Sequence, residues 1–241
     1  MKIFAHRGAS GAFPENTIAA FKEASYLPVY GVEFDVHMTA DDELVVIHDE
    51  KINRTSTGKG YVKDKTLTEL KSYDFGSWFS PDFTGETIPT LQEVLEVFCG
   101  TDHILNIELK SDIFPYEGMV EKVITNVTDM QMESRVVLSS FDHGAIQLAK
   151  KLAPSIETGA LFMEVLVNPV DYIRNIPADA LHVLFPAAIR PSMRELFESG
   201  IPVRTFTVND ENYARMLQQA GVEAIFTDYP EKMHALLKDH H

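Results

Sequence analysis

Residues 32–37 read VEFDVH, and this short stretch decides how the chain must fold. Apolar and polar side chains alternate along it, which predicts a β-strand with Glu33, Asp35 and His37 on one face and three apolar side chains on the other. In an α/β barrel, the outer face of each strand packs against helices. The acidic face of this strand would therefore point into the barrel.

The rest of the chain repeats one pattern, a short apolar run followed by a longer amphipathic stretch. This alternation is typical of βα units that form a parallel sheet. The strand candidates are residues 3–5, 31–37, 104–109, 135–139, 158–162, 180–184, 203–207 and 224–227. The helix candidates are residues 16–26, 91–98, 116–130, 142–152, 169–173, 192–198, 209–219 and 230–238. Eight such units predict a single TIM (β/α)8 barrel over residues 1–241, with a doubly wound open sheet as the alternative.

Residues 49–88 interrupt this rhythm and are predicted to form a small insertion after the second strand. They are too many for an ordinary βα loop, and long loops in compact domains are commonly lids or insertions. The segment contains a group of aromatic residues: Tyr73, Phe75, Trp78, Phe79 and Phe83. Two interpretations stay open, because these rings could only attach the insertion to the barrel or could also line the substrate pocket.

The charge balance excludes some partners. The chain has 21 basic and 36 acidic residues, and its net charge of -15 disfavours nucleic acid or an anionic membrane surface. The first residues, MKIFAHRGASGAF, interrupt the apolar stretch that a signal peptide needs, and no apolar run reaches about 18 residues. We therefore expect a cytoplasmic protein without stable membrane insertion. Cys99 is the only cysteine, which excludes an intrachain disulfide, and we expect it to be a buried apolar residue at a helix end.

Two apolar runs end in a histidine. In barrel enzymes the strand ends and the loops after them build the active site. One run ends in His6, which Arg7 follows with a planar group suited to phosphate, and a second run ends in His48. The short link before this second run predicts that it pairs with the VEFDVH strand as a hairpin, which would hold His48 near Glu33 and Asp35. Histidine is the side chain best able to transfer a proton near neutral pH.

The strand candidate at 104–109 adds a third carboxylate, because Asn106, Glu108 and Lys110 would alternate inward. Buried carboxylates repel one another and lose their hydration, so they need a cation or a shared proton. A divalent metal with oxygen ligands would satisfy Glu33, Asp35 and Glu108 together. The alternative is an internal ion pair with lysine or arginine. Lys110 would then be the counter-charge for a bound phosphate.

Taken together, these motifs follow an order that resembles the glycerophosphodiester phosphodiesterase family. The matching segments are HRG at 6–8, PENT at 14–17, EFDV at 33–36, HD at 48–49, IPTL at 88–91 and ELK at 108–110. The strand ends SSF at 139–141, TVN at 207–209 and TD at 227–228 are also similar. The resemblance covers nearly the full chain, is strongest in the first 110 residues, and includes the insertion after His48.

The resemblance implies hydrolysis of a glycerophosphodiester to sn-glycerol 3-phosphate and an alcohol, with one divalent ion, Mg²⁺ or Ca²⁺. The residues that match functional positions of the family are His6 and His48 as the acid–base pair, Glu33, Asp35 and Glu108 as metal ligands, and Arg7, Glu15 and Lys110 as residues that contact the phosphate or support the metal shell. Phe206 stands where the family commonly has tryptophan, so it keeps a flat apolar wall but changes the glycerol side of the pocket. His182 also points inward, and we expect it to be a core or interface histidine.

Other functions remain as alternatives. A related barrel enzyme acting on lysophospholipids or other lipid head groups would be favoured by an exposed aromatic patch. A barrel that only binds metal or phosphate would not need two histidines. An amidohydrolase or aldolase lacks support, because no strand ends in His-x-His and no inward lysine lies in an apolar pocket. The sequence does not decide the metal, the alcohol, a monomer or homodimer, or whether water or the substrate 2-hydroxyl attacks.

Overall fold

The computed structural model describes residues 1–238, and in them eight parallel strands close into a barrel. These strands are β1 (Lys2–His6), β2 (Gly31–Met38), β4 (Ile104–Leu109), β5 (Val136–Ser140), β6 (Glu157–Phe162), β7 (Ala180–Leu184), β8 (Val203–Phe206) and β9 (Ala224–Thr227). Pairing of β1 with both β2 and β9 closes the cylinder. The predicted TIM barrel is confirmed, and the open doubly wound sheet is excluded because it would leave two free edges.

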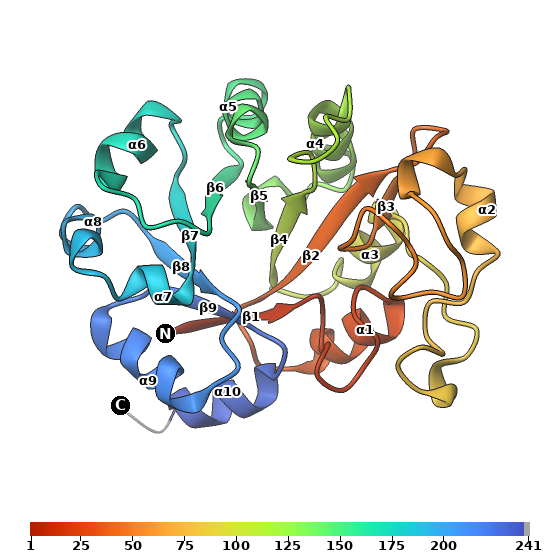
Figure 1. Ribbon diagram of the computed structural model, residues 1–241, viewed down its shortest axis with the longest axis horizontal. Coiled ribbons are helices and arrows are strands. Elements are labelled where there is room, and N and C mark those ends of the chain that lie inside the picture. Colours follow the sequence, from red (N-terminus) through yellow and green to blue (C-terminus); the bar gives the residue numbers. More distant parts are fainter. Residues whose placement is uncertain (239–241) are drawn as a thin grey trace.

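Helices surround the strands as an outer ring (Figure 1). They are α1 (Ile18–Tyr26), α3 (Leu91–Val97), α4 (Met119–Asp129), α5 (His143–Leu152), α6 (Pro169–Asn175), α7 (Phe185–Ala188), α8 (Arg194–Glu198), α9 (Glu211–Ala220) and α10 (Pro230–Lys238). Several begin at a side chain that accepts from the first free backbone N–H groups, as Thr17, Asp142 and Asp210 do. The sequence located most of these helices within three residues, but it missed α7.

The two faces of β2 point as the sequence predicted, with the apolar face toward the helices and the acidic face toward the barrel interior. Val32, Phe34 and Val36 are fully buried under the helices, in one cluster with α1 and α3. Glu33 and Asp35 face the interior, where β2 pairs with β4 so that Asp35 lies opposite Glu108. The register thus brings acidic residues 73 positions apart in the chain onto adjacent strands.

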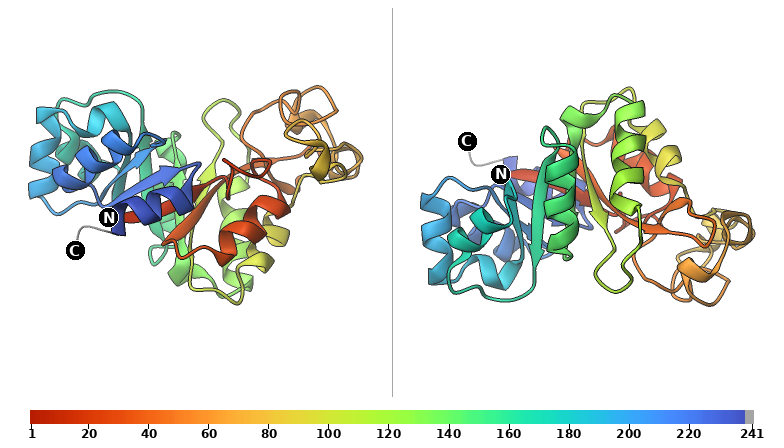
Figure 2. Two further views of the ribbon diagram at one scale, coloured as in Figure 1. Left: turned by 90° about the horizontal axis from the view of Figure 1, so that it is seen from below. Right: turned by 90° about the horizontal axis from the view of Figure 1, so that it is seen from above.

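The insertion is built on a hairpin. β3 (Leu44–Val46) pairs antiparallel with the end of β2, as the short link predicted. The segment after it carries α2 (Leu67–Lys71) and protrudes from one side of the barrel (Figures 1 and 2). Its own small core includes Phe75, with Tyr73 packed against it. These two rings therefore stabilise the insertion itself.

Two further features concern the surface. Cys99 lies two residues after the end of α3, close to the expected helix end, but its side chain is exposed, so the prediction of a buried cysteine is wrong. The apolar face of α3 already buries Val94, Leu95 and Phe98 against the barrel, and the next position turns outward. None of the helices within residues 1–238 has both the length and the apolar character that crossing a membrane requires.

Candidate active site

Three carboxylates meet at the carboxyl end of the barrel strands. Glu33 and Asp35 come from β2 and Glu108 from β4, and one oxygen of each lies within 4.8 Å of the others. Glu33 and Asp35 are almost completely buried. Asn16 donates from Nδ2 to Asp35 Oδ2 at 2.9 Å, which fixes the orientation of that carboxylate. The structure thus brings together the residues that the sequence nominated as metal ligands.

The charges of this cluster are only partly balanced. Burial, together with the charges of Asp35 and Glu108, raises the pKa of Glu33 well above its ordinary value. Burial also raises the pKa of Glu108, although Lys110 opposes this. Burial alone would raise the pKa of Asp35, but the positive charges of His48, Arg7 and Lys110 outweigh burial and lower this pKa below its ordinary value. A proton shared at Glu33, or a cation beside it, would relieve the repulsion.

The protein's own cations lie at the edge of the cluster. Lys110 Nζ is 3.0 Å from Glu108 Oε1, and Arg7 Nε is 3.4 Å from Asp35 Oδ2. Arg7 also donates from Nη1 to Glu15 Oε1 at 2.8 Å, so its charge is divided between two carboxylates. Glu15 supports Arg7 and does not join the three-carboxylate group. Among residues 1–238, the alternative of ordinary ion pairs accounts for Asp35 and Glu108 but puts no lysine or arginine side chain within 4.0 Å of Glu33. This carboxylate accepts from the backbone N–H of Arg7 at 3.0 Å and lies 3.9 Å from His6.

A sharp turn after β1 creates that backbone contact. Arg7 adopts a φ of 56° and Gly8 a φ of 81°, both in the left-handed region. A Cβ at position 8 would lie 2.9 Å from Ala20, so only glycine fits between this turn and α1. The turn aims the Arg7 N–H at Glu33 while the strand end holds His6 at the rim of the cluster.

His6 is held by a residue from the far end of the chain. Its Nδ1 lies 2.7 Å from Asp228 Oδ1, and Asp228 also accepts from Ser10 Oγ at 3.1 Å and Asn209 Nδ2 at 2.6 Å. Burial would raise the pKa of Asp228, but these hydrogen bonds and the charge of His6 hold it at about 2. Because an ionised Asp228 accepts a hydrogen bond from Nδ1–H of His6, Nε2 is left facing the carboxylates.

His48 has a similar support from its neighbour in sequence. Its Nδ1 lies 2.7 Å from Asp49 Oδ1, and Arg54 donates to both oxygens of Asp49 at 2.8 and 3.0 Å. Arg54 also binds both oxygens of Glu15 at 2.8 Å, which ties the insertion to the loop after β1. His37, which the sequence placed beside the carboxylates, instead has Nε2 3.1 Å from the His48 carbonyl oxygen and fixes the backbone there.

A cavity of about 280 Å³ opens beside the carboxylates. Its charged side contains His6, Arg7, His48 and Lys110 with two of the carboxylates. Its opposite side is mostly apolar and includes Phe206, whose ring packs against Phe141 at 5.9 Å between centroids. The predicted substrate residues Arg7, Lys110 and Phe206 therefore lie around one space, while Glu15 lies behind Arg7.

A second, more open hollow of about 450 Å³ lies on the other side of His6 and Arg7. Phe79 from the insertion lines it together with Glu15, Asp228 and Tyr229. The insertion rings therefore differ in their positions, although none of them lines the cavity beside the carboxylates. Tyr73 and Phe75 hold the insertion together, and Phe79 faces the hollow next to the histidine.

Sequence reasoning matched the strand ends that contain Asp228 and Asn209 but gave these residues no role, and it missed Arg54. Asp228 comes directly after the apolar run 224–227, which is the same signal that drew attention to His6 after β1. Asn209 lies three residues after the end of β8. Arg54 gave no signal, because it lies in an irregular segment whose course depends on the insertion's own packing.

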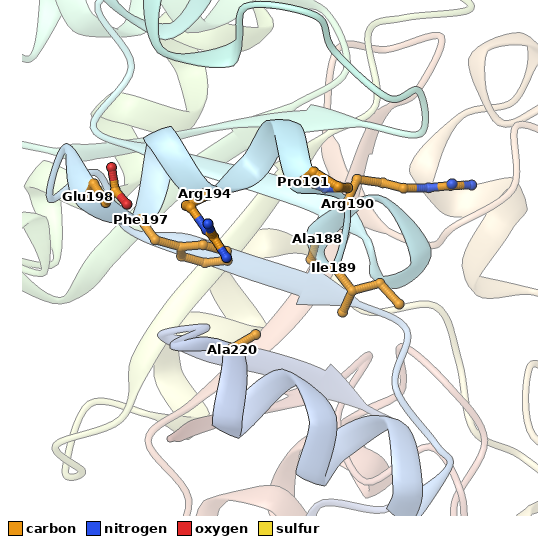
Figure 3. Close-up of a pocket in the computed structure, with 8 residues that line it drawn as sticks. All are labelled: Ala188, Ile189, Arg190, Pro191, Arg194, Phe197, Glu198 and Ala220. Carbon is orange, nitrogen blue, oxygen red and sulfur yellow. The ribbon is translucent and has the colours of Figure 1, made fainter.

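A larger hollow of about 640 Å³ lies outside the barrel, beside α7, α8 and the end of α9 (Figure 3). Its lining residues are Ala188, Ile189, Arg190, Pro191, Arg194, Phe197, Glu198 and Ala220. No predicted site residue is among them, and the three-carboxylate group lies elsewhere. The candidate active site is therefore the smaller cavity inside the barrel mouth.

Comparison with known proteins shows which family the chain resembles. The family model described as the glycerophosphoryl diester phosphodiesterase family matches residues 6–232. The chain is 43% identical over 234 residues to a glycerophosphodiester phosphodiesterase of Bacillus altitudinis, and the match covers 96% of each chain. It is 41% identical over 236 residues to a glycerophosphodiester phosphodiesterase of Caldanaerobacter subterraneus, and this match covers 98% of this chain and 97% of the relative. Its structure is similar to that of an Oleispira antarctica phosphodiesterase in complex with the product sn-glycerol-3-phosphate, with a TM-score of 0.89, 32% identity, and coverage of 99% and 97%.

Proposed function

Because the chain belongs to the glycerophosphoryl diester phosphodiesterase family, we propose that it hydrolyses glycerophosphodiesters to sn-glycerol 3-phosphate and an alcohol, using one divalent cation and the His6 and His48 pair. The observation that carries the proposal is the position of the carboxylates. Three of them converge from two strands next to two imidazoles, each of which is held by its own aspartate.

Hydrolysis of a phosphodiester makes two demands that these residues meet. The attacking oxygen must lose a proton and the departing alkoxide must gain one. His6 and His48 both line the cavity, and each has Nδ1 occupied by an aspartate, so each presents Nε2 for proton transfer. One imidazole accepts the proton and the other donates it.

The phosphate carries negative charge that must be stabilised as the reaction proceeds. Arg7 and Lys110 line the cavity on the side of the carboxylates and supply fixed positive charge for the phosphate oxygens. Lys110 is tied to Glu108 and Arg7 to Asp35 and Glu15, so both cations are positioned before the substrate arrives. Prepositioned charge in a buried site stabilises more than mobile charge in water.

The carboxylate group fits a divalent cation. Glu33, Asp35 and Glu108 would hold it, because three hard oxygen donors lie close together and no described lysine or arginine side chain lies within 4.0 Å of Glu33. When bound, Mg²⁺ or Ca²⁺ would neutralise the phosphate charge and polarise the reacting phosphorus centre.

A panel of metals against substrates tests the proposal. We expect turnover of glycerophosphocholine to disappear with EDTA and to return on addition of Mg²⁺ or Ca²⁺, measured as sn-glycerol 3-phosphate released. Turnover that persists in EDTA would contradict the role of the carboxylates. Absence of turnover with every metal and every glycerophosphodiester would contradict the activity.

A second candidate, hydrolysis of lysophospholipids, is favoured by one observation. The loop after β6 exposes Met163, Val165 and Val167 at 58%, 51% and 87%, and Met163 also lines the cavity. These side chains would suit an acyl chain leaving the pocket. The two candidates are separated by comparing kcat/KM for glycerophosphocholine and a lysophosphatidylcholine, where a clear preference for the lipid would replace the first candidate.

A further inference from the structure

Apart from Nε of Arg7, which lies 3.4 Å from Asp35 Oδ2, two buried polar atoms of the residues that line the cavity have no hydrogen-bond partner in the residues that the structure describes. They are Nδ1 of His182 on β7 and Oδ1 of Asn106 on β4. His182 is fully buried and Asn106 almost so. An unpaired buried donor or acceptor costs on the order of tenfold or more in a folding or binding equilibrium, so such atoms commonly have a partner. Both belong to residues that line the space next to the carboxylates.

The proton of His182 is located by its other neighbour. Arg204 Nη1 lies 3.5 Å from Nε2 of His182, and a guanidinium can only donate, so Nε2 is the acceptor. Arg204 is itself held by ion pairs with Glu157 and Glu223. The neutral ring therefore carries its proton on Nδ1. Burial, together with the charge of Arg204, lowers the pKa of His182 well below its ordinary value and keeps the ring neutral.

The barrel makes room for this imidazole. A Cβ at position 159 would lie 2.5 Å from the His182 ring, so the neighbouring strand β6 must have glycine there. The ring also packs against Phe226 at 5.3 Å between centroids. Its place at the cavity wall is thus fixed by rigid strands and not by a mobile loop.

Asn106 supplies the complementary atom. Its Nδ2 donates to Ser139 Oγ at 2.9 Å, which orients the amide and leaves Oδ1 as an unused acceptor. The cavity wall therefore offers one N–H donor and one carbonyl acceptor among the rings of Phe141, Phe206 and Phe226. A hydroxyl group can accept from the first and donate to the second, and a short carbon chain suits the apolar rings.

We propose that His182 and Asn106 form a hydroxyl-binding pair that recognises the glycerol half of the substrate. The inference rests on the proposed function, because the charged side of the same cavity takes the phosphate. It assigns His182 a specificity role in place of the core or interface role expected from sequence. The glycerol hydroxyls would complete the two hydrogen bonds, while a diester without hydroxyls leaves both polar atoms unpaired.

The experiment compares two ligands that differ only in hydroxyl groups, sn-glycerol 3-phosphate and propyl phosphate. Their dissociation constants are measured by calorimetry with the divalent cation present, in the wild-type chain and in His182→Phe, which keeps a flat ring but lacks the N–H. The wild type should prefer sn-glycerol 3-phosphate by roughly ten- to a hundredfold, and the variant should lose most of that preference with propyl phosphate unchanged. An equal preference in both proteins overturns the proposal, and so does a wild type that binds the two ligands alike.

Control variants separate recognition from folding. His103 also has an unpaired buried Nδ1 but does not line the cavity, so His103→Phe should leave the preference intact. His182→Gln retains an N–H donor and should keep part of the preference, and His182→Leu replaces the Phe variant if that chain does not fold. The binding comparison does not require turnover, so it separates this inference from the proposed function. A chain that prefers sn-glycerol 3-phosphate through His182 but cleaves no diester would refute only the proposed function.

Discussion

The two histidines of the site have the same immediate partner and different surroundings. Each imidazole places Nδ1 2.7 Å from an aspartate. The His6 pair joins residues 222 positions apart and exists only because β1 and β9 meet where the barrel closes. The His48 pair joins consecutive residues at the start of the insertion.

The aspartates differ in what supports them. Asp228 accepts from the neutral groups of Ser10 and Asn209, so its negative charge is not cancelled by a neighbour. Asp49 is bound by the guanidinium of Arg54, which offsets that charge. The His6 side chain is also less exposed than that of His48, 14% against 34%. Burial lowers the pKa of the His6 ring, and the hydrogen bond to Asp228 opposes this shift. Charge interactions are stronger where water is excluded, so His6 should depend on its aspartate more than the more exposed His48 does.

The largest expected effect removes either imidazole. His6→Ala and His48→Ala should each lower kcat by at least about a hundredfold, because each deletes one proton-transfer group. Metal binding measured by calorimetry should persist, since neither side chain belongs to the carboxylate group. Unchanged turnover in either variant would remove that histidine from the acid–base pair and end the comparison.

Replacing the aspartates tests the difference between the pairs directly. Asp228→Asn should lower kcat by roughly tenfold to a hundredfold, in the range seen when partners of catalytic groups are removed. Asp49→Asn should cost less, because Arg54 already offsets the charge that is lost. Steady-state kinetics on both variants should show this order with KM little changed, and the reverse order would show that burial and neutral support do not favour the His6 pair.

Acid should weaken the His6 pair in a defined window. The pKa of Asp228, about 2, lies below the ordinary value for aspartate, so its contribution to stability is present above about pH 4 and is lost as the pH falls toward 2. The contribution is on the order of 2 kcal/mol in the free energy of unfolding. Urea unfolding of wild type and Asp228→Asn should therefore differ most above pH 4 and converge on acidification. A difference that grows as the pH falls would contradict the sign.

The smallest effect concerns the support of the His48 pair. Arg54 is partly exposed, and exposed ion pairs contribute about 1 kcal/mol or less. Arg54→Met should lower global stability little, but it should increase hydrogen exchange in the insertion, because the bridge to Glu15 is lost. Lys232→Met, which breaks an exposed pair with Glu211 on the barrel surface, is the matched control and should leave the insertion unchanged.

Much of the site was predictable because it follows from alternation along single strands. The period of two in residues 32–37 put Glu33 and Asp35 on the inner face, and the same rule put Glu108 there. The short link before β3 predicted the hairpin. These are local features, and the barrel fold inferred from the βα pattern predicted that the three carboxylates would lie close together.

Other residues could not be read in this way. Asp228 gave a strand-end signal but no indication that it would meet His6, and Arg54 gave none. The burial of a side chain after a helix was also misjudged at Cys99, because the last turn rotates that position outward. The sequence identified His182 as pointing inward, but only the positions of Arg204 and Gly159 around the ring show that Nδ1 is left unpaired.

The sequence by itself determined the barrel, the inward face of each strand and the acidic character of its mouth, because these depend on periodicity and on the order of elements. Tertiary structure alone decided which distant groups pair, since strand register and ring closure set those distances. The partner of His6 and the atoms that His182 leaves free are of this second kind, because each depends on a strand from another part of the chain.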